Sequence, residues 1–226
     1  MRIACIGDLH GVDRWKEVKE MEVDEVVFVG DYVDSHDLDD SAIFQNLQEV
    51  LAFKREANEK VTLLLGNHDV HYLYHPNFRA TGFRNSMQQM LTQLFQENQS
   101  LFQVAYAIDS YLITHAGVSK SWVSQHIGAP YDAKSLAEAL NRMQFDGDSL
   151  QQLAEIGVAR GGRASYGGPF WCDFHRELFL DPILGIHQVV GHTQSKFLIR
   201  EEVGDSWLID VNYLAYSDEE IFILEL

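Results

Sequence analysis

The sequence predicts a layered α/β fold for a single domain. Short apolar runs, several of them rich in β-branched residues, are typical of buried strands. Between these runs lie stretches whose apolar residues recur at helical spacing. Strands that alternate with helices along a chain favour a layered α/β architecture. A length of 226 residues, with 46% apolar and 23% charged residues, suits one globular domain of this class.

The predicted strands are short. In chain order they cover residues 2–7, 25–29, 61–65, 110–114, 187–190, 196–202, 206–212 and 220–226. We expect the last three to be antiparallel. The run KFLIREEVGDSWLIDV predicts a hairpin that turns at Gly204-Asp205, because these turn residues separate two strand-like runs.

Four amphipathic helices are predicted between the strands. Apolar residues fall on one face across 41–57 and across 85–97, and shorter stripes mark 136–143 and 150–154. Such stripes are most simply the core-facing sides of helices. No cofactor is needed to explain them.

The charge balance excludes several classes of partner. The chain has 17 Lys and Arg residues against 34 Asp and Glu residues, a net charge of −17. A DNA or RNA partner would require clustered basic residues, so we expect no nucleic-acid polymer. An anionic membrane surface is disfavoured for the same reason. An acidic protein that handles phosphate needs a local source of positive charge, and a metal ion would supply it.

The cysteine content and the apolar runs suggest a cytoplasmic protein. Cys5 and Cys172 lie far apart in the sequence, which is typical of a reduced intracellular protein rather than a disulfide scaffold. The first residues contain no long apolar stretch, so we expect no signal peptide. No segment approaches the roughly 20 apolar residues that are needed to span a bilayer.

Polar side chains come directly after five of the predicted strands. These residues are Asp8 with His10, Asp31, Asn67, His115 and His192. Ligands of open α/β sheets bind at the carboxyl ends of the strands, so we expect the six side chains to meet at one edge. Glycine precedes most of these residues and lets the backbone turn sharply near a ligand.

The six residues together suggest a metal centre. Carboxylate and amide oxygens with imidazole nitrogens, and no thiolate, suit Mn, Fe, Zn or a similar divalent ion. Six candidate ligands are more than one ion with open positions requires, but they suit two ions that share a bridging carboxylate. Two ions about 3.5–4 Å apart can bind the oxygens of an in-line displacement at phosphorus.

The motifs resemble those of the calcineurin-like metallophosphoesterase superfamily. They are GDLHG (7–11), GDYVDS (30–35), GNHD (66–69), THAG (114–117) and GHT (191–193). GDYVD is similar to the phosphoprotein phosphatase branch, which includes serine/threonine phosphatases. The motifs span most of the chain and are specific as an ordered set. The resemblance implies a four-layer α/β/β/α sandwich with mixed sheets and a binuclear metal centre.

The resemblance also implies which metal each residue binds. Asp8 and His10 would bind the first ion, Asp31 would bridge both, and Asn67, His115 and His192 would complete the second. His68 would lie near the leaving-group oxygen and donate a proton or hydrogen bond. Asp34 would hold His68 in the required tautomer and raise its basicity.

The implied reaction is phosphoester hydrolysis. Bound metals would lower the pKa of a water molecule, and the metal-bound hydroxide would attack phosphorus in line without a phosphoenzyme. A phosphomonoesterase of the serine/threonine-phosphatase type is the first hypothesis. A pyrophosphohydrolase for dinucleoside polyphosphates such as diadenosine tetraphosphate, or a phosphodiesterase, is the alternative. A non-catalytic scaffold typically loses metal ligands, whereas this chain has all six and His68.

The substrate-binding positions depart from the pattern. The protein-phosphatase branch carries a phosphate-binding Arg after GDYVD, where this chain has Ser35. A second such Arg is expected between the third and last His motifs, where the glycine-rich stretch 157–173 offers Arg160 and Arg163. Arg160 is slightly favoured. The last motif continues with Gln194 instead of the His found in many members, so the first metal is expected to have fewer protein ligands.

Residues 118–180 are predicted to be a variable insert that faces the substrate within one domain of residues 1–226. Both flanks of this segment contribute to the same centre. The substrate is expected to be a phosphorylated small molecule, a nucleotide or a phosphopeptide. Manganese is the first choice of metal, with Fe, Zn, Ni or Co as alternatives, because the affinity order alone does not decide. The sequence leaves the oligomeric state open.

Overall fold

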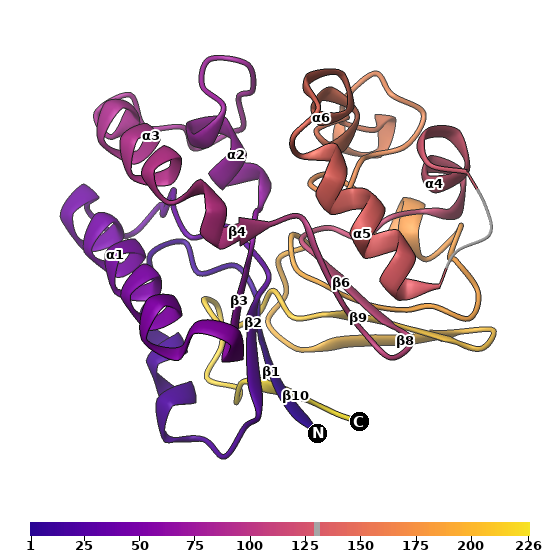
Figure 1. Cartoon of the computed structure of the whole chain (residues 1–226), viewed down its shortest axis with the longest axis horizontal. Helices are drawn as coiled ribbons and strands as arrows, with labels where there is room; N and C mark the ends of the chain where they lie inside the picture. Colours follow the sequence, from indigo (N-terminus) through magenta and orange to yellow (C-terminus); the bar gives the residue numbers. More distant parts are fainter. Residues whose placement is uncertain (129–131) are drawn as a thin grey trace.

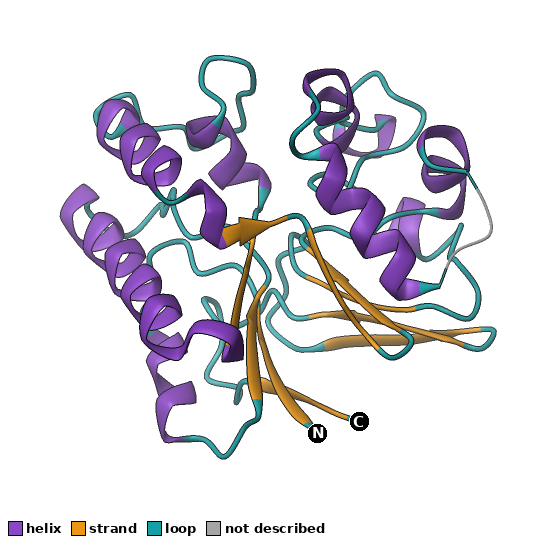
Figure 2. Ribbon diagram, viewed as in Figure 1, coloured by secondary structure: helices purple, strands orange, loops and turns teal. Residues whose placement is uncertain are grey.

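Two five-stranded β-sheets pack face to face, and helices cover the outer side of each sheet (Figures 1 and 2). The computed structural model describes residues 1–128 and 132–226. The predicted α/β class is confirmed, together with the four-layer order that the motif resemblance implies.

The first sheet has the strand order β10-β1-β2-β3-β4. Its strands are β1 (Arg2–Ile6), β2 (Glu25–Phe28), β3 (Val61–Leu64), β4 (Phe102–Gln103) and β10 (Phe222–Glu225). The pairs β1–β2, β2–β3 and β3–β4 are parallel, whereas β10 runs antiparallel to β1. The carboxyl ends of β1, β2 and β3 therefore lie along one edge.

The second sheet has the order β5-β6-β7-β9-β8. Its strands are β5 (Ala105–Ile108), β6 (Tyr111–Thr114), β7 (His187–Val190), β8 (Ile199–Val203) and β9 (Ser206–Asp210). β6, β7 and β9 are parallel in the centre, and β5 and β8 are antiparallel at the edges. Val203 pairs with Ser206, so the predicted hairpin does turn at Gly204-Asp205.

Alternating side chains of each strand pack on different layers. Ile3 and Cys5 of β1 belong to a buried cluster with residues of β6, β7 and β9, which fills the space between the sheets. Ala4 and Ile6 point the other way and share a cluster with residues of α1. This alternation gives each sheet two buried faces, as four layers require.

The helices cover the outer faces. α1 (Asp40–Ala57), α2 (Asn67–Leu73) and α3 (Gln88–Glu97) lie on the first sheet, and α4 (Lys120–His126), α5 (Ala133–Met143) and α6 (Gly147–Leu153) lie over the second (Figure 1). Short 3₁₀ segments occupy Arg14–Glu20, Asn58–Lys60, Gln99–Leu101 and Val158–Arg160, and Phe174–Leu178 forms a π-helical turn. Within the described ranges, no helix has the length and apolar character needed to cross a membrane.

The predicted elements agree with the structure except at two places: β10 pairs with β1 in the first sheet and not with the β8–β9 hairpin, and the residues after β3 form a helix. Helices α1, α3, α5 and α6 occupy the predicted amphipathic stretches. The strand predicted at 61–65 ends at Leu64, and Asn67 begins the unpredicted helix α2. The Asp69 side chain accepts the backbone N–H of Gly66 at 2.8 Å and so stabilises this helix start. The abrupt change from strand to helix places the side chains after Gly66 at the edge of the sheet.

Candidate active site

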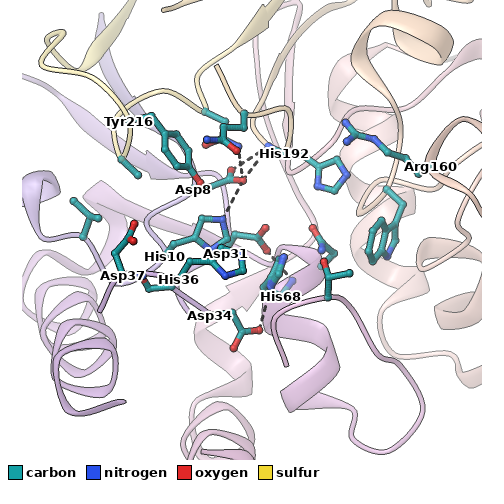
Figure 3. Close-up of a pocket in the computed structure, with 18 residues that line it drawn as sticks. Asp8, His10, Asp31, Asp34, His36, Asp37, His68, Arg160, His192 and Tyr216 are labelled. Carbon is teal, nitrogen blue, oxygen red and sulfur yellow. Dashed lines mark hydrogen bonds and ion pairs between the residues drawn. The ribbon is translucent and has the colours of Figure 1, made fainter. Parts of the chain in front are cut away.

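The strand ends of both sheets meet at a cleft of about 280 Å³ (Figure 3). Five of the six predicted metal ligands line it: Asp8, His10, Asp31, Asn67 and His192. The sixth, His115, is fully buried behind them. The first sheet supplies Asp8, His10, Asp31 and Asn67, and the second supplies the other two. The structure thus brings all six residues together.

Backbone carbonyl groups orient two of the histidines. Nδ1 of His10 lies 2.8 Å from the carbonyl oxygen of Val33, and Nδ1 of His115 lies 2.9 Å from that of Val29. A carbonyl oxygen only accepts, so each Nδ1 carries the proton and donates it. Nε2 of each neutral ring is then left with a lone pair, which is the form that binds a metal.

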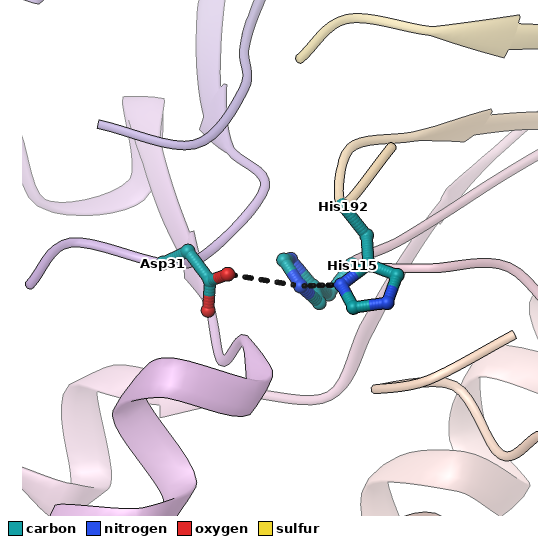
Figure 4. A group of neighbouring side chains, drawn as sticks. All are labelled: Asp31, His115 and His192. Atoms are coloured by element: carbon teal, nitrogen blue, oxygen red, sulfur yellow. Dashed lines mark hydrogen bonds and ion pairs between the residues drawn. The ribbon is translucent and has the colours of Figure 1, made fainter. Parts of the chain in front are cut away.

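Three polar atoms lie around Nε2 of His115, and Figure 4 shows the two that come from Asp31 and His192. This nitrogen lies 2.9 Å from Asn67 Oδ1, 3.2 Å from His192 Nδ1 and 3.4 Å from Asp31 Oδ2. Burial, helped by His115 and Arg160, holds the pKa of His192 well below its usual range, so its ring is neutral. A single proton serves only one of these contacts. A cation serves all four atoms, so the residues fit a divalent metal ion.

The charge at His115 also favours a cation. Burial alone would favour the neutral ring, but the carboxylates of Asp31 and Asp8 outweigh burial and raise the pKa of His115 to about 9. Protons and metal ions compete for such a nitrogen, because a metal ligand must be deprotonated.

A second group of possible ligands shares Asp31 with the first. Ligand atoms of Asp8, His10 and Asp31 lie within 4.8 Å of one another. Asp8 accepts the backbone N–H of His192 at 3.0 Å and the Asn212 amide at 2.7 Å. Burial raises the pKa of Asp8, because the charged carboxylate lies away from water. A bound cation would offset that desolvation, so this group also fits a metal ion.

Asp31 is held in place from several sides. Asp69 accepts the backbone N–H groups of Asp31 at 2.8 Å and of Tyr32 at 3.0 Å. Burial works against the charged form, but His115 and His68 outweigh it and hold the pKa of Asp31 well below its usual range. The shared carboxylate is therefore ionised and fixed.

The backbone at the site is strained. Among the described residues, six that are not glycine have a positive φ. Four of them are predicted site residues: His10 (φ 45°), Asp31 (φ 55°), Asp34 (φ 67°) and His192 (φ 71°). L-residues rarely adopt this region, and such strain concentrates at functional sites.

Two motif glycines permit close contacts between strand ends. A Cβ atom at Gly66 would lie 2.2 Å from Asp31 Oδ1, and one at Gly191 would lie 2.4 Å from Asp8 Oδ1. Any larger residue would displace these carboxylates. Glycine at these positions thus allows polar residues to approach within the first sheet, at Gly66, and between the two sheets, at Gly191.

His68 and Asp34 form a pair beside the possible metal ligands. Nδ1 of His68 lies 3.0 Å from Asp34 Oδ2, so the carboxylate accepts the Nδ1 proton. Burial lowers the affinity of His68 for a proton, but Asp31 and Asp34 outweigh burial and raise its pKa to about 9. His68 lines the cleft, where its Nε2 can face a bound substrate (Figure 3).

The structure separates the two candidate arginines. Arg160 lines the cleft, and its guanidinium lies 3.0 Å from the Asp173 carboxylate and donates to the Thr193 hydroxyl at 2.8 Å. Arg163 is exposed and does not line the cleft. Trp171 lies edge-on to His192, with a distance of 5.5 Å between ring centroids. Of the two arginines, only Arg160 is placed to contact a ligand in this cleft.

Sequence analysis missed several residues of the site. One of them is Asn212, whose side-chain amide donates to Asp8. Asn212 stands at the end of the predicted strand 206–212, in the same way as the predicted site residues stand at the ends of their strands. That position is a usable signal. Asp69, His71 and Tyr72 come after His68 on α2, and their contacts become visible only when this short helix is known.

Comparisons with known proteins agree with this geometry. A family model described as calcineurin-like phosphoesterase matches residues 1–194. A cold-active protein-tyrosine phosphatase of a psychrophilic Shewanella species has a similar structure, with a TM-score of 0.63 and 20% identity over 99% of this chain and 75% of that chain. A protein serine/threonine phosphatase from Saccharomyces cerevisiae, similar to human phosphatase PP5, matches with a TM-score of 0.53 and 15% identity. The match covers 92% of this chain and 66% of that chain. A comparison with curated proteins found no match.

At these identities the solved structures show a shared fold. The family match carries more, because it covers most of the chain and includes every motif from Gly7 to Thr193. The chain belongs to the calcineurin-like phosphoesterase family and is a metal-dependent phosphoesterase.

Proposed function

We propose that this protein is a phosphomonoesterase of the serine/threonine-phosphatase type with a binuclear metal centre. One observation carries the proposal: two groups of metal-binding side chains share Asp31, and the oriented His68–Asp34 pair lies beside them. Two adjacent cation sites with a proton donor at their side suit the hydrolysis of a phosphoester.

The first ion would be held by Asp8, His10 and Asp31. The second would be held by Asp31, Asn67, His115 and His192. When bound, two such ions supply Lewis acidity and lower the pKa of a coordinated water molecule. The donor set combines carboxylate and amide oxygens with imidazole nitrogens and lacks sulfur, and among the divalent ions that suit it we propose manganese as the metal.

His68 would serve the leaving group. Asp34 accepts its Nδ1 proton, so Nε2 is the nitrogen that faces the cleft. A proton on Nε2 would pass to the leaving-group oxygen as its bond to phosphorus breaks. Without that proton the leaving group would depart as an alkoxide, and this departure is slow. His68 should therefore matter most for alkyl phosphates such as phosphoserine.

Arg160 would bind the phosphate. Among the described residues that line the cleft, it is the one arginine, and no lysine lines the cleft. Asp37 lies on the side of the cleft opposite Arg160 and forms no ion pair within the described part of the chain (Figure 3). A single cation with a further carboxylate on the opposite side of the cleft suits a single phosphate better than a chain of phosphates. This distribution of charge favours a phosphomonoester over a dinucleoside polyphosphate.

Residues 118–180 would form a substrate-facing insert within a single domain. The segment supplies Arg160 and Trp171 to the cleft, and it joins β6 to β7, which supply His115 and His192. Because both flanking strands belong to the second sheet, the segment can vary without separating the metal ligands.

Hydrolysis of a mixed substrate panel tests the proposed function. The panel contains p-nitrophenyl phosphate, bis-p-nitrophenyl phosphate, a phosphothreonine peptide and diadenosine tetraphosphate, assayed in Mn²⁺ buffer with wild-type protein and His68→Asn. We expect hydrolysis of the two monoesters and a strong loss in the variant on the peptide. The metal content is measured on the same samples.

Each alternative predicts a different pattern. If diadenosine tetraphosphate is hydrolysed in preference to the monoesters, the protein is a pyrophosphohydrolase and the monoesterase proposal is wrong. If two metals bind but no substrate turns over, the proposed substrate class is wrong. If no metal binds, the proposed centre itself is wrong.

A further inference from the structure

We propose that His71 is a positioning residue that acts through Asp34 to fix the proton-donating orientation of His68. The inference rests on the proposed function, because it assigns His68 to the leaving group. It adds a residue that contacts neither the substrate nor a metal.

Helix α2 presents three side chains to Asp34. His68, His71 and Tyr72 stand at positions i, i+3 and i+4, which lie on the same face of a helix. All three reach the one carboxylate: His68 and His71 contact Oδ2 at 3.0 and 2.7 Å, and the Tyr72 hydroxyl donates to Oδ1 at 2.6 Å. The short helix therefore forms a socket for Asp34.

The proton of His71 is placed by the backbone. Nδ1 of His71 accepts the backbone N–H of Ala80 at 3.2 Å. Because Nδ1 accepts this bond, it carries no proton, and the ring proton lies on Nε2. Nε2 lies 2.7 Å from Asp34 Oδ2, and this contact favours the charged carboxylate. The His71 side chain is completely buried, so water cannot replace it.

Tyr72 is fixed in the same way. Its hydroxyl oxygen accepts the backbone N–H of Arg84 at 2.9 Å, which leaves the hydroxyl proton to point at Asp34. The Arg84 side chain donates to the carbonyl oxygens of Ser35 and of Leu38, the latter at 2.9 Å. These bonds tie the loop after Asp34 to the segment that carries Ala80.

Three donors leave the Asp34 carboxylate little freedom to rotate. Oδ2 contacts both histidines and Oδ1 accepts from Tyr72, so the direction offered to Nδ1 of His68 is set by the other two contacts. Without His71, Oδ2 loses one of its two partners and the carboxylate can turn away from His68. The consequence is a less well-aligned proton at the leaving group, with the metal ligands unchanged.

This role predicts an effect that depends on the leaving group. The nitrophenolate of p-nitrophenyl phosphate departs readily without a proton, whereas the alkoxide of a phosphoserine peptide needs one. His71→Phe keeps an aromatic ring against Tyr72 and Phe83 but removes the donor. We expect kcat on the peptide to fall about 10- to 100-fold, the range for partners that orient a functional histidine. The loss on p-nitrophenyl phosphate should be much smaller.

Two further variants separate positioning from folding. His71→Gln keeps an amide donor that can reach Asp34, and it should recover part of the lost kcat. His126→Phe is the matched control, since it removes another histidine whose Nε2 contacts a carboxylate, at 3.0 Å from Glu155 and outside the cleft. It should leave the ratio of the two substrates unchanged. Metal content should stay at the wild-type value in all three variants.

NMR of the imidazole nitrogens gives a readout that does not depend on activity. In wild-type protein, His71 should show an unprotonated Nδ1 and His68 a slowly exchanging Nδ1–H. Exchange of the His68 Nδ1 proton should become fast in His71→Phe and should be partly slowed again in His71→Gln. Unchanged exchange in His71→Phe would overturn the proposal, whatever the activity.

The kinetic outcomes distinguish this inference from the proposed function. If kcat of His71→Phe falls equally on both substrates, or falls on neither, the proposed role of His71 is wrong. The proposed function still stands in that case, provided that the wild type hydrolyses monoesters. A wild type that binds metals but hydrolyses no phosphoester would overturn the proposed function. The NMR comparison then still decides whether His71 holds the pair in place.

Discussion

Oδ1 of Asp31 accepts a hydrogen bond of 2.8 Å from the backbone N–H of His68. The proposed bridging carboxylate is thus bonded to the first turn of α2, the helix that carries the proposed proton donor. Its other oxygen lies 3.4 Å from His115 of the second sheet. A change at Asp31 should therefore reach the metals and His68 together.

Asp31→Asn should lose metal and activity at once. The amide oxygen can still accept the His68 N–H, but the side chain has lost the charge shared by the two groups of ligands. We expect fewer than two metals per chain by elemental analysis and at least about a 100-fold fall in kcat/KM on p-nitrophenyl phosphate. Full activity with two bound metals would contradict the bridging role.

Arg160→Ala should weaken substrate binding. Removing a charge-assisted hydrogen bond to phosphate costs about 1.5–3 kcal/mol, so kcat/KM should fall roughly 10- to 100-fold. Arg163→Ala is the control, because Arg163 is exposed and outside the cleft. Arg160→Lys should recover only part of the loss, because a single ammonium cannot bind phosphate as a planar fork does. Steady-state kinetics of the three variants check the assignment. A larger loss at Arg163 would reverse it.

Asp37→Lys should shift specificity towards substrates with more negative charge. Asp37 is an exposed carboxylate opposite Arg160, and charges near a protein surface interact by about 1 kcal/mol or a few times that. The ratio of kcat/KM for diadenosine tetraphosphate to that for p-nitrophenyl phosphate should rise up to about tenfold and decline again with added salt. Asp148→Lys introduces the same charge change at an exposed position on α6 and should leave the ratio alone. An equal shift in both variants would assign the effect to net charge.

Asp69→Ala should destabilise the protein. The Asp69 carboxylate is fully buried and accepts backbone N–H groups of Asp31, Tyr32 and Gly66. Each donor left without a partner costs about 1–3 kcal/mol, so the free energy of unfolding should fall by roughly 3 kcal/mol or more. Denaturant unfolding measures it. A loss below about 1 kcal/mol would mean that water replaces the carboxylate.

Strand ends are the informative part of the sequence. An apolar run that stops at a glycine and a polar residue predicts both a buried strand and a polar group at its exit, because the sheet buries the apolar run and a polar group at the sheet edge can find a polar partner. Asp8, Asp31 and Asn67 are predicted in this way, and the structure places them in one cleft. Their roles as metal ligands remain predictions.

Contacts that depend on tertiary structure could not be predicted in the same way. The choice between Arg160 and Arg163 depends on the conformation of a glycine-rich loop, which no periodic pattern describes. The socket of His71 and Tyr72 requires a helix of seven residues, and this helix comes after a strand with no turn residue other than Gly66 between them. Strand β4 has two residues, too few for any alternation.

Strand β10 completes the first sheet by pairing along β1, with Arg2 opposite Glu225. β1 is the strand that leads to Asp8. Asn212 binds Asp8 and also comes from a distant part of the chain. On the ribosome, one edge of β1 therefore stays unpaired until Phe222–Glu225 have left the exit tunnel. Such distant pairing is slow because a long loop must close first. We expect nascent chains to gain their activity only after these residues emerge, because until then the edge of β1 lacks its partner strand.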